Sequence, residues 1–188
     1  QISLFYSNFF FPPLIGVYCA FLWRFENFHS CRHTLMTQPV KLSTIYCSKY
    51  CMVCAITVLT QLWFTVLYLV SGKIVGLPGL PPTDICGWIV RGTIGGFVIA
   101  TVQYLVASVI RNFAIPIAVG LFGGISGLLI SNTSAGIYWP YSLMLLGMNS
   151  NKYDDMLSSQ LPLFFFFSIF YILLFLLLGI WMLGKNES

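Results

Sequence analysis

Three cysteines carry the spacing closest to that of a metal site. Cys47, Cys51 and Cys54 follow a Cys-x3-Cys-x2-Cys pattern, which in a soluble radical enzyme would hold an iron–sulfur cluster. Here Cys51 and Cys54 fall in an apolar run, where they would not converge in a loop, and cysteine packs well as a small hydrophobe. We therefore interpret these thiols as packing residues.

The remaining titratable side chains give no catalytic arrangement either. Glu26 and His29 form a Glu-x-x-His pair, but His33 is the only other histidine, so the second pair of a di-iron site is missing. Asp154-Asp155 lie in a polar loop, whereas an intramembrane protease needs its acids inside helices. A Gly-x4-Gly-Lys-Ser/Thr phosphate loop is absent. We expect no catalytic residue, metal or cofactor in this chain.

The composition excludes a soluble protein. Of the 188 residues, 7% are charged, 58% are hydrophobic and 17% are aromatic. So few charges cannot cover a water-facing surface around so many apolar side chains, and lipid must be the solvent. The net charge of +4 is too small and scattered for nucleic-acid binding.

Five apolar runs predict membrane-spanning helices, because a span needs about 20 such residues and must satisfy its own backbone polar groups. The sequence therefore predicts an all-α polytopic membrane helix bundle. Pro12-Pro13 predict a kink or break in the first run, and only Arg111-Asn112 separate the third from the fourth, which predicts a tight hairpin. The runs are Ile2–Trp23, Tyr50–Val70, Trp88–Ile110, Phe113–Ile130 and Leu161–Leu183.

The distribution of Lys and Arg predicts the orientation. By the positive-inside rule the side with six such residues is cytoplasmic and the side with three is exterior. On the exterior side, the loop Ser131–Gln160 carries an aromatic patch, residues 138–141, which lies in the membrane interface or dips back as a re-entrant turn. The six are Arg24, Arg32, Lys41, Lys49, Arg111 and Lys185, and the three are Lys73, Arg91 and Lys152.

The helix interiors are uncharged and rich in glycine. The central thirds of the five runs hold no charged residue or histidine, and Gln61 and Gln103 are expected to form interhelical hydrogen bonds. Small-xxx-small spacings in the third and fourth runs predict close helix packing. The packing glycines are Gly92, Gly96, Gly120, Gly124 and Gly127.

The stretch Arg24–Lys49 between the first two spans is amphipathic. Phe28, Leu35 and Met36 lie on or near one helical face with polar residues between them, and Pro39 ends the predicted helix. A short helix in this place either transmits force from a soluble partner or only anchors the loop at the membrane surface. Spacing alone leaves both readings open.

These residues also carry a family resemblance. The order Glu26, Leu35-Met36, Pro39-Val40 and Lys49 resembles the coupling loop of type-2 ABC exporter permeases, and Asn27-Phe28 resembles the lantibiotic-immunity branch. Matching at the level of residues is confined to positions 26–49. Phe28 and the pair at 30–31 depart from the second acid and Gly-Thr of the wider family. The first of the family's six helices has no counterpart, so we expect the chain to lack its N-terminus.

The resemblance implies one ABC-2-type transmembrane domain, residues 1–188, with a cytoplasmic coupling loop at residues 24–49. It implies a multi-pass permease of a bacterial plasma membrane, paired with a second permease (the same or a paralogue) and with a separate ATPase that binds ATP and Mg. The implied function is expulsion of a cationic amphipathic lantibiotic peptide from membrane lipid for self-immunity. The alternative is an accessory membrane protein that sequesters a peptide toxin or scaffolds a complex without transport. The implied ATPase-coupling residues are Glu26, Asn27, Phe28, Arg32, Leu35, Met36, Pro39 and Lys49.

Overall fold

The computed structural model describes residues 2–27, 42–76, 84–110, 112–150, 155, 157 and 159–185. Every regular element in these ranges is a helix, and five of the helices are long and apolar enough to cross a membrane. The predicted all-α polytopic bundle is confirmed. The spans are Ile2–Arg24, Ser43–Ile74, Ile85–Val109, Ala114–Ser131 and Leu161–Lys185.

The first crossing changes its helical form along its length. It begins as α1 (Ile2–Phe5), continues as a π-helical turn, η1 (Tyr6–Phe10), and ends as α2 (Phe11–Asn27). Pro12 and Pro13 lie in the first turn of α2, and neither has an N–H to donate to the carbonyl four residues earlier. The chain nevertheless stays helical through the prolines, without the predicted break, and the change of form is a π-helical turn that ends just before them.

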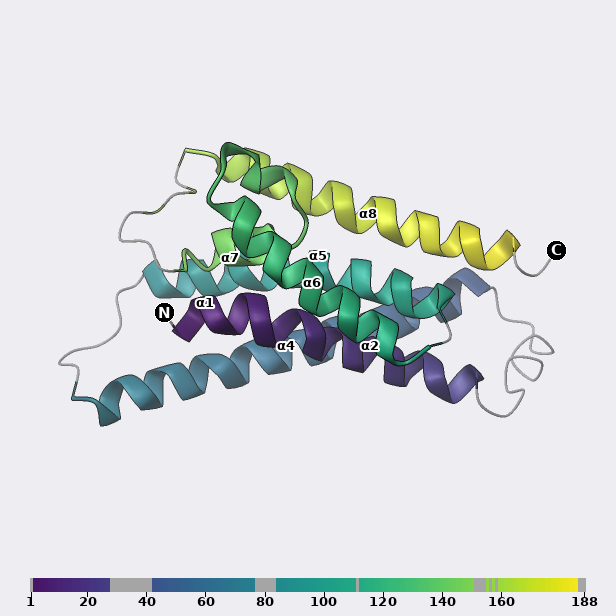
Figure 1. The fold of residues 1–188 in the computed structure, drawn as a ribbon, viewed down its shortest axis with the longest axis horizontal. Helices are drawn as coiled ribbons and strands as arrows, with labels where there is room; N and C mark the ends of the chain where they lie inside the picture. The colour runs from purple at the N-terminus through teal and green to yellow at the C-terminus, as the bar shows by residue number, and fades with distance from the viewer. Residues whose placement is uncertain are drawn as a thin grey trace.

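The second crossing is longer than its apolar run. The helix α4 extends without interruption from Leu42 to Ile74, so it begins eight residues before Tyr50, where the apolar run starts. Its 33 residues span about 50 Å, well beyond a hydrocarbon core of about 30 Å. It lies along one edge of the bundle (Figure 1), and Leu62, Trp63 and Val66 are exposed on it, as expected of a surface that faces lipid.

The third and fourth crossings form the predicted hairpin. The helix α5 (Asp84–Val109) and the helix α6 (Ala114–Ser131) are joined by a short turn in which Asn112 Oδ1 accepts a hydrogen bond from the Ala114 N–H at 2.9 Å. The helix α5 contacts α2, α4, α6, α7 and α8, and its Ile99 and Tyr104 are fully buried. It is the central helix of the bundle.

Two short helices follow before the last crossing, α8 (Leu161–Lys185). A 3-10 turn, η2 (Ser134–Tyr138), leads into α7 (Ser142–Gly147), and α7 packs against α5 and α6. We call residues 134–150 the re-entrant segment. Its aromatic patch divides, because Tyr138 is 52% exposed whereas Tyr141 is buried at 5%.

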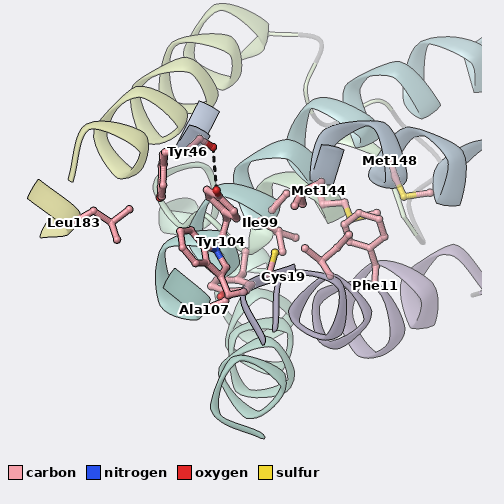
Figure 2. Close-up of a cluster of buried hydrophobic side chains, with 14 residues drawn as sticks. Phe11, Cys19, Tyr46, Ile99, Tyr104, Ala107, Met144, Met148 and Leu183 are labelled. Carbon is pink, nitrogen blue, oxygen red and sulfur yellow. Dashed lines mark hydrogen bonds between the residues drawn. The ribbon is translucent and has the colours of Figure 1, made fainter. Parts of the chain in front are cut away.

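The two ends of the bundle are distinct. One end holds the end of α2, the start of α4, the α5–α6 turn and the end of α8, and the other holds the start of α5 and of α8 together with α7 (Figure 1). We call them the inner and the outer end, following the predicted orientation. The buried core runs between them, as Figure 2 shows.

Candidate functional site

The predicted coupling loop leaves and re-enters the bundle at the inner end. Glu26 and Asn27 are the last two residues of α2, and Lys49 is in the second turn of α4. The other predicted coupling residues, Phe28, Arg32, Leu35, Met36 and Pro39, lie outside the described residues. The described residues therefore include the two helix ends that flank the loop, namely the end of α2 and the start of α4, and we call these the supports of the loop.

Lys49 links these two supports. Its ammonium lies over the ring of Trp23 in α2, with 4.5 Å between Lys49 Nζ and the ring centroid. Trp23 is 9% exposed, so the contact is largely shielded from solvent. A cation–π contact of this kind is worth about 2 kcal/mol when desolvated. The last turns of α2 and the first turns of α4 are thus joined by a side-chain contact.

Aromatic rings extend this link to the central helix. Tyr104 of α5 lies 5.6 Å from Trp23, 4.6 Å from Tyr46 and 5.8 Å from Tyr50, between ring centroids. The Tyr104 hydroxyl also donates to the Tyr46 carbonyl at 2.9 Å, the bond drawn in Figure 2. Each aromatic pair contributes about 0.5–1.5 kcal/mol beyond its burial. We call Trp23, Tyr46, Lys49, Tyr50 and Tyr104 the basal cluster.

The basal cluster also reaches the last helix. Gly179 of α8 packs on the Tyr46 hydroxyl so closely that a Cβ at this glycine would overlap it. Leu183, one turn further along, is 4% exposed and belongs to the same buried core. The ends of α2 and α4 that flank the loop are therefore connected to α5 and α8 through packed side chains. Tight packing transmits strain because protein interiors have low compressibility.

The two buried glutamines form the interhelical hydrogen bonds expected of them. Gln61 of α4 accepts from the Tyr6 hydroxyl at 3.1 Å, and its Nε2 donates to Met148 Sδ at 3.8 Å. The Tyr6 ring is stacked on Phe64, with 3.7 Å between centroids. Gln61 thus ties α4 to the first crossing and to the end of the re-entrant segment.

Gln103 has a more unusual position. Its amide oxygen accepts from the Gly120 N–H at 2.9 Å and from the Tyr141 hydroxyl at 3.0 Å, and its amide nitrogen donates to the Pro116 carbonyl at 2.9 Å. This is the amide orientation in which each contact joins a donor to an acceptor. The Gln103 amide therefore spans one turn of α6, from the Pro116 carbonyl to the Gly120 N–H. It also holds Tyr141, the most buried ring of the aromatic patch at 138–141.

The glycines of α6 lie where backbone meets backbone. A Cβ at Gly120 would come within 2.6 Å of the Pro12 carbonyl oxygen, and one at Gly124 would overlap the Asn8 carbonyl. A Cβ at Gly127 would come within 2.8 Å of the Tyr141 carbonyl oxygen. The helix α6 therefore approaches the first crossing at the segment that the two prolines interrupt.

Of the α5 glycines, Gly92 and Gly96 face side chains, whereas Gly95 lies against the backbone of α7, with a Cβ there coming within 2.5 Å of the Met144 N and Cα. The nearest atoms to a Cβ at Gly92 belong to Met148, and those at Gly96 belong to the Phe11 ring.

The cysteines of the Cys-x3-Cys-x2-Cys pattern are free thiols, exposed at Cys47 and Cys51 and half-buried at Cys54. Within the described ranges, no three His, Cys, Asp or Glu side chains gather as metal ligands.

One ion pair is missing from the sequence-based prediction. Arg91 of α5 forms a two-pronged ion pair with Asp155, at 3.2 Å from Nη1 to Oδ1 and 2.8 Å from Nη2 to Oδ2. The Arg91 hydrogen bonds, together with the Leu157 N–H, hold the pKa of Asp155 below its usual 3.8. The position of Arg91 inside an apolar run was the available signal, since such residues mark functional sites.

Comparison with known proteins gives one match. Neither the curated proteins nor the solved structures contain a match to this chain. The family model described as ABC-2 family transporter protein matches residues 1–127, which include the first three crossings, most of the fourth and the predicted coupling loop. Because the match covers more than half of the 188 residues, the chain belongs to the ABC-2 transporter family and is a multi-pass permease subunit of an ABC transporter.

Proposed function

We propose that this permease expels a cationic amphipathic peptide of the lantibiotic class from the membrane, using ATP hydrolysed by a separate partner chain. The coupling loop, residues 24–49, is the contact with that ATPase. Glu26 and Arg32 make charged contacts with the ATPase, and Phe28 and Leu35 seat in its groove as apolar anchors. A second permease, identical or paralogous, completes the transporter in the bacterial plasma membrane.

The observation that carries this proposal is the basal cluster. Asn27 is the last residue of α2 and Leu42 is the first residue of α4. About one turn back in α2 and two turns into α4, Trp23 and Lys49 join the two helices. A push on the loop therefore moves α2 and α4 as one body. The Tyr104 contacts pass that movement to α5, the helix that touches every other crossing. Pro39 would stiffen the joint between the loop and α4.

The distribution of polar groups supports this substrate class. The central thirds of the spans carry no charge, and Gln61 and Gln103 are engaged in hydrogen bonds between helices. An uncharged interior favours an apolar or amphipathic substrate over a hydrated ion. The outward surfaces of α4 and α8 are broadly apolar, with Trp63 and Phe166 among the most exposed side chains. A peptide that is already embedded in lipid suits such a surface.

The direct test is co-purification with an ABC ATPase, combined with peptide resistance of the host cell. Glu26→Arg and Leu35→Asp are expected to abolish both, because they reverse or bury a charge at the proposed contact. Val75→Asp is the matched control, since Val75 is 80% exposed at the far end of α4. Wild-type assembly and resistance in both loop variants would contradict the coupling assignment.

A second measurement separates export from sequestration. Cells that carry this permease are loaded with labelled peptide, with an intact ATPase or with one whose phosphate-loop lysine is replaced. Export predicts low accumulation only with the intact ATPase. Equal accumulation with both ATPases would instead support an accessory protein that binds the peptide without transport.

A further inference from the structure

Arg91 is a charged residue inside a membrane-spanning helix. It lies in the span Ile85–Val109 and its side chain is only 12% exposed. An arginine in such a place is costly unless it is paired, and it then marks a functional position. Its partner Asp155 is 64 positions away in the sequence and lies beyond the re-entrant segment. The pair therefore joins α5 to the chain that leaves this segment.

The geometry of the pair makes it a strong contact. Both nitrogens of the guanidinium fork donate to the two oxygens of Asp155, which is the arrangement that favours Arg over Lys. Asp155 Oδ1 also accepts from the Leu157 N–H at 3.2 Å, so the carboxylate orders its own turn. Asp155 itself is 33% exposed, which leaves it within reach of water.

The re-entrant segment lies directly on α5 beside this pair. A Cβ at Gly147 would come within 2.7 Å of the Arg91 carbonyl oxygen, and the Met148 side chain fills the space in front of Gly92. The end of α7 is thus in backbone contact with the turn of α5 that carries Arg91. Nothing larger than glycine fits at position 147 while the two elements are closed.

The residues that follow α7 bury polar side chains. Asn149 has a φ of 47°, in the left-handed region, and caps α7: the N–H groups of Asn149 and Ser150 donate to the carbonyls of Leu146 at 3.1 Å and Leu145 at 3.3 Å. The Asn149 amide nitrogen and oxygen, and the hydroxyl of Ser150, are buried without a hydrogen-bond partner among the described residues. These buried side-chain groups cost free energy that opening to water would release.

From these contacts we propose that Arg91 and Asp155 form a latch that keeps the re-entrant segment closed on the outer end of the bundle. When the pair parts, residues 147–150 separate from α5 and the polar groups of Asn149 and Ser150 become hydrated. Arg91 is a positioning residue that acts through Asp155. Only the assignment of this opening to peptide release rests on the proposed function; the latch does not.

The latch is tested by the rate at which a buried thiol becomes accessible. Ser150 is 3% exposed, so a cysteine at Ser150 (Ser150→Cys) reacts with N-ethylmaleimide only when the segment opens. The exposed Cys86 near the same end is replaced by serine, and modification at position 150 is followed by mass spectrometry in the full-length protein in lipid vesicles. Asp155→Ala is expected to raise the rate about fivefold, the change that about 1 kcal/mol produces.

Two variants make the result specific to the pair. The exchange Arg91→Asp with Asp155→Arg restores opposite charges and is expected to return the rate toward that of the parent. Lys73→Gln removes an exposed charge at the same end of the bundle and is expected to leave the rate unchanged. Equal rates in Asp155→Ala and the parent, or no recovery in the exchange, would overturn the latch.

The thiol-labelling test of the latch does not depend on whether the proposed peptide is the substrate. If the thiol rates follow the expected order but no peptide is exported, the latch stands and the proposed substrate is wrong. If export is observed while the thiol rates do not change, the permease function stands and the latch is wrong.

Discussion

The inner and outer ends of this permease are held by different kinds of interaction. At the inner end, Trp23, Tyr46 and Tyr104 pack ring against ring, and the Lys49 ammonium covers one of the rings. At the outer end, the Arg91–Asp155 ion pair fastens α5 to the chain that follows the re-entrant segment. Aromatic packing has no equivalent partner in water, whereas a charged pair exchanges its partner for water at moderate cost.

This difference suits two mechanical roles. A joint that must carry force has to stay intact through the cycle, which buried rings and close glycine contacts achieve. A closure that must open once in each cycle needs a contact that water replaces, and polar groups that gain from hydration. The proposed direction of work, from a rigid inner end to a releasable outer end, follows from these contacts.

The largest effect is expected from removing the central ring of the inner end. Tyr104 is fully buried, and Tyr104→Ala should lower the free energy of unfolding by about 3–5 kcal/mol through lost packing and a cavity. Tyr104→Phe keeps the ring and loses only the bond to the Tyr46 carbonyl, about 0.5–1.5 kcal/mol. Thermal unfolding in detergent measures both. Equal losses would show that the hydrogen bond, rather than ring packing, holds this end.

A smaller effect is expected at Lys49. Lys49→Met keeps most of the side-chain volume but removes the charge over Trp23, which should cost about 1–2 kcal/mol. Lys49→Arg, which also places a cation on the ring, is the control. If Lys49 joins the supports of the loop, Lys49→Met leaves binding of the ATPase intact and lowers ATP-driven export. Loss of ATPase binding would show instead that Lys49 contacts the partner directly.

The smallest effect concerns the ion pair and depends on pH. Arg91 lowers the pKa of Asp155 below 3.8 in the folded protein, so the stabilisation is complete above the unfolded pKa and is lost as the pH falls through the folded one. Parent and Asp155→Asn should differ by roughly 2–4 °C in Tm between pH 5 and 7, as expected of a contribution near 1 kcal/mol. Below about pH 4 the difference should shrink. A difference that does not change with pH would mean that the carboxylate charge is unimportant.

Local sequence patterns were sufficient for the spans and their connections. The run of apolar residues marks each crossing, and the short Arg111-Asn112 link specifies the hairpin of α5 and α6. These features were predictable because lipid forces each helix to satisfy its own backbone, so the information lies within about 20 consecutive residues. The resemblance to the family was drawn from residues 26–49 alone, whereas the family model matches residues 1–127.

The side-chain contacts of the site required the assembled fold. Nothing near Lys49 in the sequence shows that its ammonium lies on Trp23, and nothing near Arg91 points to Asp155. The sequence likewise did not show that Tyr141 alone of the rings at 138–141 is buried in the bundle, where its hydroxyl donates to Gln103.

The sequence by itself therefore determined that this chain is a helical membrane permease and which stretches form its spans, because hydrophobicity and backbone pairing act over short stretches. The tertiary structure alone decided which helices are joined at the inner end and which carboxylate pairs with Arg91 at the outer end. Those contacts arise between residues far apart in the chain, where the packing of close-fitting helix faces chooses the partner.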